Sequence, residues 1–238
     1  MGQVRLYIEH PLAPGQPVPL GPAQAHYLGA VMRLGPGARI EVFNGRDGAW
    51  TAEIEAVGKR GGSLALVAQA APQRDPPDVW LMFAPIKKAR TDFIVEKATE
   101  LGAARILPVQ TDHTNAERIA RDRLQAHAVE AAEQCGGTFV PEVAALAPLS
   151  GLLDRWDTGR RILWADEALA GPAATLATLP RGPWAILIGP EGGWSAAERA
   201  RLGALEGVTR VSLGPRILRA DTAAVAALAL WQAALGDW

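Results

Sequence analysis

The 238-residue sequence predicts an α/β protein in which a parallel sheet follows a small β-rich domain. Up to residue 70, apolar residues come in short runs separated by turn residues, a pattern typical of antiparallel strands. From Val79 onward, apolar runs of strand length alternate with segments of helical periodicity, which is the βαβα pattern of a parallel sheet. A proline-rich segment separates the two regions.

The first region, residues 1–70, is predicted to form a separate β domain. Its strand-like runs are residues 4–8, 38–43, 50–57 and 64–68. Asn44-Gly45 between the second and third runs favours a β-hairpin, because both residues tolerate a positive φ. Residues 71–77 then place three prolines in seven positions and are predicted to be an extended linker. The second domain is therefore expected to span residues 78–238.

In the second region, five apolar runs are predicted to be parallel strands. They are residues 79–84, 105–109, 161–165, 184–188 and 209–213. One helix is predicted to end before Gly136-Gly137, and another to begin at Ser195, where Ser195 and Glu198 have capping-box spacing. In the last helix Ala224, Leu228, Trp231 and Leu235 share a face. This face is interpreted as core by default, with a dimer surface as the alternative.

Composition limits the function classes. The chain is 49% hydrophobic, enough for a sizeable core, and its net charge of -1 gives no general attraction to nucleic acid. A nucleic-acid partner would therefore need a local basic patch. The lone Cys135 cannot form an internal disulfide and no signal peptide is recognised, so a cytoplasmic protein is expected. The longest apolar stretch, residues 223–231, is too short to span a membrane.

Two glycine-bearing segments are predicted to form one ligand pocket lined by backbone. They are residues 186–195 (ILIGPEGGWS) and 211–222 (VSLGPRILRADT). Each runs from an apolar strand through glycine into a helix, which brings the backbone close to a ligand. An ordinary strand-to-helix turn explains the first segment equally well. Neither segment has the G-x-G-x-x-G or Gly-Lys-Ser/Thr spacing, so dinucleotide and P-loop sites are disfavoured.

The second segment gathers ionisable groups at a strand end, where open α/β sheets bind their ligands. Arg216, Arg219, Asp221 and Thr222 lie within seven residues. The alternative is a plain helix N-terminus with Asp221 as its cap and solvated arginines.

Five blocks, in order along the chain, resemble the bacterial 16S rRNA uracil-N3-methyltransferases of the RsmE type in the SPOUT superfamily. The strongest are GPEGGWS and LGPRILRADTA in the two glycine segments. The other three are His26-Tyr27-Leu28 with Val31-Met32-Arg33 and Gly37, residues 97–102 (KATELG), and residues 130–135 (EAAEQC). The resemblance implies a PUA-like β-barrel domain followed by a SPOUT-type parallel sheet with a C-terminal trefoil knot. It further implies a homodimer that uses S-adenosyl-L-methionine, without a metal, to methylate a uridine at N3 in 16S rRNA or the small ribosomal subunit.

The resemblance implies the cofactor-binding residues position by position, and it supports hypotheses for the catalytic and RNA-binding residues. The cofactor-binding residues are expected to be Leu163, Trp164, Ile188, Gly189, Gly192, Gly193, Ser212, Leu213, Gly214, Ile217, Leu218 and Thr222. For catalysis, Arg219 is expected to stabilise or orient the uracil, and Asp221 or Glu191 to be the carboxylate nearest the reacting atoms; the general base is not assigned. The RNA-binding residues are expected to be His26, Arg33, Lys87, Lys88, Arg90 and Arg216.

Simpler interpretations of the basic residues remain open. Lys87-Lys88 is compatible with a solvated strand end, His26 with a packed or capping histidine, and Lys97 with a lysine at the edge of a helix face. A non-catalytic RNA-binding or ribosome-assembly factor is the alternative function.

The sequence departs from the family pattern in three places. Asp221 stands where glutamate is usual, Gly137 where an arginine is usual, and residues 112–114 (DHT) replace a loop that more often carries glutamate and arginine. The last two departures weaken RNA contacts inferred for those loops.

Overall fold

The computed structural model describes residues 4–166 and 173–238. The chain forms two compact units, each described here by itself. The first contains Met1–Asp75 together with Ala132–Val140, and the second contains Pro76–Ala131 together with Pro141–Trp238.

The first unit is built on a five-stranded sheet with the strand order β1-β3-β4-β5-β2. Its elements are β1 (Arg5–Tyr7), β2 (Pro17–Leu20), α1 (Pro22–His26), the π-helical turn η1 (Tyr27–Val31), β3 (Arg39–Phe43), β4 (Ala49–Gly58) and β5 (Gly61–Ala71). The four predicted strands correspond to β1, β3, β4 and β5. Sequence reasoning missed β2 because its two prolines argue against a strand; β2 lies at the sheet edge, where prolines are tolerated.

The predicted hairpin between β3 and β4 is present, with a five-residue connection. Gly45 takes the positive φ of 78° that its position requires. The amide of Asn44 donates to Asp47 at 2.6 Å, and the carboxylate of Asp47 also accepts the backbone N–H of Leu12 at 2.9 Å. These hydrogen bonds, the one from Leu12 first, lower the pKa of Asp47.

Arg5 ties the end of helix α3 (Arg121–Cys135) to the first unit. Its guanidinium donates to the carbonyl oxygens of Ala132 and Gly137, each at 2.8 Å, and pairs with Glu41 at 2.6 Å. It also lies 4.7 Å from the centre of the Phe43 ring. The helix stops before Gly136 as predicted. These contacts explain why residues 132–140 belong to the first unit, whereas the sequence placed residues 78–238 in one domain.

The second unit is built on a parallel sheet with the strand order β12-β10-β11-β6-β7-β8, and β9 pairs with β7 beside this path. Its strands are β6 (Val79–Phe83), β7 (Arg105–Gln110), β8 (Glu142–Val143), β9 (Ala147–Pro148), β10 (Arg161–Ala165), β11 (Trp184–Ile188) and β12 (Val208–Val211). Its other elements are α2 (Lys88–Glu100), most of α3, α4 (Leu149–Leu153), the 3-10 helix η2 (Ala173–Thr178), α5 (Ala196–Ala204) and α6 (Ala220–Leu235). The five predicted strands are all present, but β12 ends at Val211, so Ser212 and Leu213 lie in the following loop.

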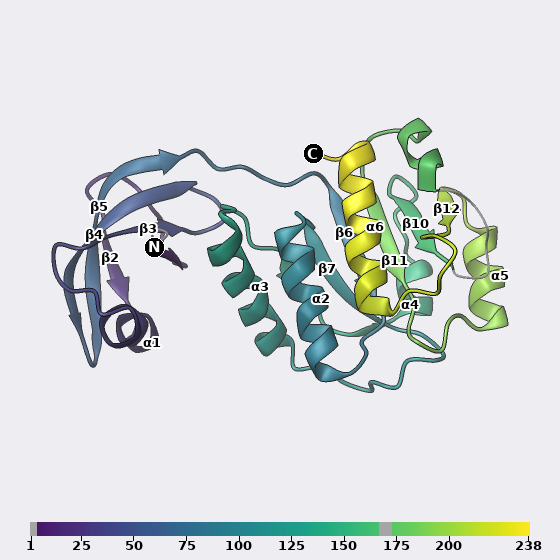
Figure 1. Ribbon diagram of the computed structural model, residues 1–238, viewed down its shortest axis with the longest axis horizontal. Helices are drawn as coiled ribbons and strands as arrows, with labels where there is room; N and C mark the ends of the chain where they lie inside the picture. Colours follow the sequence, from purple (N-terminus) through teal and green to yellow (C-terminus); the bar gives the residue numbers. More distant parts are fainter. Residues whose placement is uncertain (1–3, 167–172) are drawn as a thin grey trace. The chain divides into compact units, whose positions relative to one another are not determined.

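Helices cover both faces of this sheet. Figure 1 shows α2 and α6 side by side across one face of the sheet. Helix α6 contacts both α2 and the strand β11. On the other face, Leu149 of α4 and Leu202 of α5 pack in one cluster with the strand residues Met82, Trp164 and Leu187. Because both faces are covered, the strands are continuous apolar runs, which is why the sequence revealed them.

The apolar stripe of α6 is core, as predicted by default. Ala224, Leu228, Trp231 and Leu235 are all buried within this chain. Gln232 on the same helix is also buried and donates to the carbonyl oxygen of Leu101 at 2.7 Å. Within the described ranges, no helix is long and apolar enough to cross a membrane.

We predict that Arg5→Ala lowers the free energy of unfolding by about 2 to 4 kcal/mol, because it removes an ion pair and leaves carbonyl groups at the end of α3 without donors. Arg5→Lys should recover only part of this loss, because ammonium cannot form the same set of hydrogen bonds. Urea denaturation measures both. Arg39→Ala is the matched control: its ion pair with Glu53 is exposed, so its cost should stay below about 1 kcal/mol. Equal costs for Arg5→Ala and Arg39→Ala would contradict this role of Arg5.

Candidate active site

The two glycine segments meet because β10 lies between the strands that precede them. β10 pairs in parallel with β11 and with β12, so the carboxyl ends of the three strands lie at one edge of the sheet. The register aligns Leu163 with Ile186 on one side and Ala165 with Val211 on the other. The loops that leave β11 and β12 are therefore neighbours, as the sequence predicted from their glycines.

A pocket of about 370 Å³ lies between these loops. It is lined by Ala165, Asp166, Ile188, Gly189, Pro190, Glu191, Gly192, Gly193, Ser212, Leu213, Gly214, Pro215, Arg216, Ile217, Leu218, Arg219, Ala220 and Ala223. Within residues 4–166 and 173–238, no group of three or more His, Cys, Asp or Glu side chains is arranged to hold a metal ion.

Most residues predicted to bind the cofactor line this pocket. They are Ile188, Gly189, Gly192, Gly193, Ser212, Leu213, Gly214, Ile217 and Leu218. Three others do not line it: Leu163 and Trp164 are buried in the sheet beneath it, and Thr222 lies on α6. Ala165 and Asp166 line the pocket but were not predicted from the sequence. They follow Trp164 directly in the chain and lie at the end of β10, where Leu163 and Trp164 were expected to contact the ligand.

Packing requires glycine at position 189. A Cβ atom at this position would lie 2.8 Å from the indole ring of Trp194. Trp194 is buried and packs edge to face on Trp164, with ring centroids 5.9 Å apart. Its Nε1 donates to the carbonyl oxygen of Ala165 at 3.4 Å. The tryptophan pair thus packs behind Gly189, so closely that only glycine fits at this position of the pocket wall.

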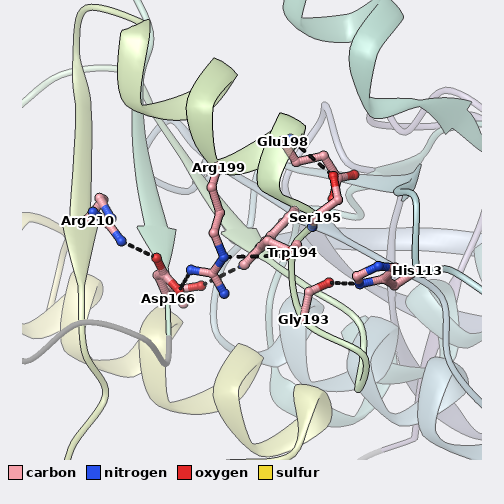
Figure 2. Close-up of polar contacts among 9 residues, drawn as sticks. His113, Asp166, Gly193, Trp194, Ser195, Glu198, Arg199 and Arg210 are labelled. Carbon is pink, nitrogen blue, oxygen red and sulfur yellow. Dashed lines mark hydrogen bonds and ion pairs between the residues drawn. The ribbon is translucent and has the colours of Figure 1, made fainter.

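The loop after β7 braces the first glycine segment. The hydroxyl of Ser195 donates to Asp112 at 2.5 Å, and the carboxylate of Glu198 accepts the backbone N–H groups of both Asp112 and Ser195 at 2.9 Å. Nδ1 of His113 lies 2.9 Å from the carbonyl oxygen of Gly192 and 3.2 Å from that of Gly193. Since carbonyl oxygens only accept, Nδ1 carries the proton in this arrangement. Figure 2 shows His113 directed at this turn.

The predicted capping box at the start of α5 is confirmed, because Ser195 accepts the backbone N–H of Glu198 while Glu198 accepts that of Ser195. The same two side chains also hold Asp112. Asp112 and His113 therefore fix the turn that lines the pocket.

Asp166 is a buried carboxylate beside the pocket. Its side chain is 0% exposed, and it accepts from Arg199 and from Arg210, each at 2.5 Å. Figure 2 shows the two guanidinium groups converging on it from α5 and β12. Arg199 also donates to the carbonyl oxygen of Trp194 at 3.3 Å. A buried carboxylate needs such partners, and here they link the ends of β10 and β12 to α5.

The charged residues of the second segment lie at the start of α6. Arg219, not Asp221, is the N-cap residue, so the interpretation of Asp221 as the cap is wrong. Asp221 instead lies in the first turn, where a negative charge interacts favourably with the helix dipole. Nη1 of Arg90 lies 3.8 Å from Oδ1 of Asp221 and 3.7 Å from Oε1 of Glu191.

The remaining residues predicted to bind RNA are solvent-accessible. Lys87, Lys88 and Arg216 in the second unit are exposed, as are His26 and Arg33 in the first. Arg33 has a φ of 56°, and no other non-glycine residue in the described ranges has a positive φ. Such a conformation costs about 1 to 2 kcal/mol and is often kept for function. The backbone thus holds Arg33 at the end of η1 with its side chain in solvent.

The chain matches known proteins over its whole length. Residues 73–232 match the family model of an RNA methyltransferase domain, and residues 20–66 match that of an RNA methyltransferase PUA domain. The ribosomal RNA small subunit methyltransferase E of Rickettsia conorii is 29% identical over 94% of this chain and 93% of its own. The Bacillus subtilis protein of the same name is 32% identical over 86% and 85%. The structure is similar to that of ribosomal RNA small subunit methyltransferase E from Neisseria gonorrhoeae bound to S-adenosyl methionine, with a TM-score of 0.91 and 29% identity over 100% of both chains.

A PUA domain joined to an RNA methyltransferase domain, with a pocket between the two glycine loops, defines the class: a two-domain RNA methyltransferase. The chain belongs to the ribosomal RNA small subunit methyltransferase E family. This confirms the resemblance and the fold class that the sequence predicted, a SPOUT-type α/β domain preceded by a PUA-like domain. The trefoil knot and the individual site residues stay predictions.

We predict that Gly189→Ala lowers the free energy of unfolding by about 1 to 3 kcal/mol, because its methyl group overlaps the Trp194 ring. Gly203→Ala in α5 is the control: a Cβ there meets nothing within 4 Å, so this change should be neutral or stabilising. Thermal unfolding compares the two. If the steric account is correct, Trp194→Phe should reduce the additional cost of Gly189→Ala; an unchanged cost would contradict it.

Proposed function

We propose that this chain transfers a methyl group from S-adenosyl-L-methionine to N3 of a uridine in 16S ribosomal RNA. The observation that carries the proposal is the pocket itself: glycine segments at the carboxyl edge of a parallel sheet, in a chain that aligns end to end with a relative bound to S-adenosyl methionine. N3 of uracil as the acceptor is supported by the family resemblance.

The residues present fit this cofactor. A volume of about 370 Å³ lies in the range of small-molecule pockets. Ile188, Leu213 and Leu218 offer apolar walls for a flat base, and the glycine turns offer backbone at close range. Glu191 lines the same pocket and places a carboxylate near a ligand that carries a positive sulfur. Backbone and apolar walls would therefore hold the cofactor, with one acidic side chain beside it.

The bound cofactor supplies an electrophilic methyl group, so the protein has two tasks. It must hold N3 in line with that methyl group, and it must help N3 lose its proton. As N3 loses its proton, negative charge spreads onto the uracil oxygens, and it is neutralised when N3 bonds to the methyl group and the positive sulfur becomes a neutral thioether. Arg219 lines the pocket, is exposed, and forms no ion pair within the described ranges, so it is available to receive this charge. Glu191 and Asp221 are the carboxylates proposed near the proton that leaves.

RNA is proposed to contact exposed basic residues of both units, namely His26, Arg33, Lys87, Lys88 and Arg216. Contacts of this kind go mainly to phosphates and position the RNA. A cytoplasmic location is proposed with this substrate, since ribosomal RNA is found there.

A homodimer is proposed as well. Its support is the family resemblance together with Ile217, an apolar residue of the pocket loop that is 86% exposed, as expected where a second chain covers the loop.

The decisive experiment measures methylation of small-subunit RNA that lacks the modification, followed by mapping of the modified nucleotide. Calorimetry should measure the binding of S-adenosyl-L-methionine to the same protein. A non-catalytic RNA-binding factor would bind RNA but would not bind this cofactor. Cofactor binding with transfer to a uridine N3 supports the proposal. RNA binding without cofactor binding would establish the non-catalytic alternative.

We predict that Arg219→Ala slows single-turnover methyl transfer by about 100-fold, because one donor to a developing negative charge is lost. Affinity for S-adenosyl-L-methionine should stay nearly unchanged. Arg155→Ala, which removes an exposed arginine in the turn after α4, should keep the wild-type rate. An Arg219→Ala enzyme at the wild-type rate would exclude this role.

We also predict that RNA affinity falls steeply with salt and that the double variant Lys87→Ala/Lys88→Ala has a shallower slope. Each phosphate contact contributes about 0.7 to 0.9 to the slope of log affinity against log salt, so losing both should reduce the slope by about 1.5. Filter binding at several salt concentrations measures this. A wild-type slope near zero would exclude phosphate contacts.

A further inference from the structure

One guanidinium group lies between the acidic side chains of the two glycine segments. Arg90 comes from the first turn of α2, Glu191 from the loop after β11, and Asp221 from the first turn of α6. Nη1 of Arg90 is 3.7 Å from Oε1 of Glu191 and 3.8 Å from Oδ1 of Asp221. Arg90 therefore joins the two halves of the pocket from a third element.

The environment of Arg90 differs from that of a phosphate-binding residue. Its side chain is 30% exposed, and Nη1 itself is buried without a hydrogen bond. Lys87 and Lys88, which precede Arg90 by three and two residues, are exposed. Ion pairs that are partly removed from water are screened less by salt than exposed ones. The charge of Arg90 is thus directed inward at two carboxylates, whereas the lysines are free to meet solvent and RNA.

The positions of the Glu191 and Asp221 carboxylates depend on the Arg90 guanidinium, because it attracts both of them. Without the guanidinium, Glu191 and Asp221 would repel each other with no positive charge between them. The group of three carries a net charge of about -1, which suits a pocket for a positively charged ligand. Distances above 3.5 Å also leave both carboxylates able to accept a hydrogen bond from another group.

We infer that Arg90 is a positioning residue for the proposed methyl transfer, and that it acts by holding Glu191 and Asp221 at the reacting face. It does not act as an RNA phosphate contact, the role that sequence similarity suggested. This inference rests on the proposed function of the pocket. It assigns to α2 a part in the chemistry that neither glycine segment reveals.

The test compares Arg90→Ala with Arg90→Lys in single-turnover methyl transfer at saturating RNA and S-adenosyl-L-methionine. We expect Arg90→Ala to lower the rate at least tenfold and Arg90→Lys to recover part of it, because the ammonium restores the charge but not the planar geometry. RNA affinity should stay within twofold of the wild type, and the salt slope should not change, whereas loss of one phosphate contact would reduce that slope by about 0.7 to 0.9. Arg155→Ala is the control for removal of an arginine and should change none of these.

Lys88→Ala gives the contrasting signature. It should weaken RNA binding and reduce the salt slope, because it removes a proposed phosphate contact. If Arg90→Ala instead shows this signature, Arg90 is a phosphate contact and the inference is overturned. In a double-mutant cycle, Arg90→Ala should cost less when Glu191→Gln and Asp221→Asn are already present; full additivity would also overturn it.

Amide hydrogen exchange separates the inference from the proposed function. In Arg90→Ala, residues 189–193 and the first turn of α6 should exchange faster than in the wild type, whether or not the chain methylates RNA. If the wild type shows no methylation, the proposed function fails while this structural link is still measured. If exchange and rate are both unchanged, the inference fails alone. Should Arg90→Ala not fold, Arg90→Lys and Arg90→Gln provide the same comparison.

Discussion

The candidate site depends on the parallel pairing of β10 with β11 on one side and β12 on the other. This pairing places three strand ends at one edge, so that loops from distant parts of the chain share a pocket. Each loop alone is an ordinary turn between a strand and a helix. The ligand site is therefore a property of the sheet order, and the glycines only permit the close approach that this order creates.

Side chains around the pocket restrict the first glycine segment, and the strand that leads into the second, before any ligand arrives. Trp194 packs on Gly189, His113 and Asp112 hold the following turn, and Asp166 links β10 to α5 and β12. A loop that is already ordered loses little conformational entropy when it binds, so more of the contact energy appears as affinity. The pocket is therefore largely preorganised: backbone forms much of its lining, and the surrounding side chains hold that backbone in place.

The sequence predicted the strands of the second unit well, because strands buried on both faces are continuous apolar runs; β10 and β11 match to the residue. It missed β2, whose prolines are tolerated only because the strand is at an edge. It also predicted most of the pocket lining, since glycine marks close approach. The supports from Asp112, Asp166 and Arg90 could not be predicted, because each depends on contacts between residues far apart in the chain, which leave no local pattern.

The position of β12 has a consequence for synthesis of the chain. β10 contains Ile162, Leu163 and Trp164, and its outer edge has no partner until residues 208–211 have been made. An unpaired apolar edge is a site for pairing with another chain, and thus for aggregation. β12 covers this edge with a four-residue strand that carries the exposed Arg210. The last strand therefore shields the apolar edge of β10 from neighbouring chains, as well as delivering the second half of the pocket.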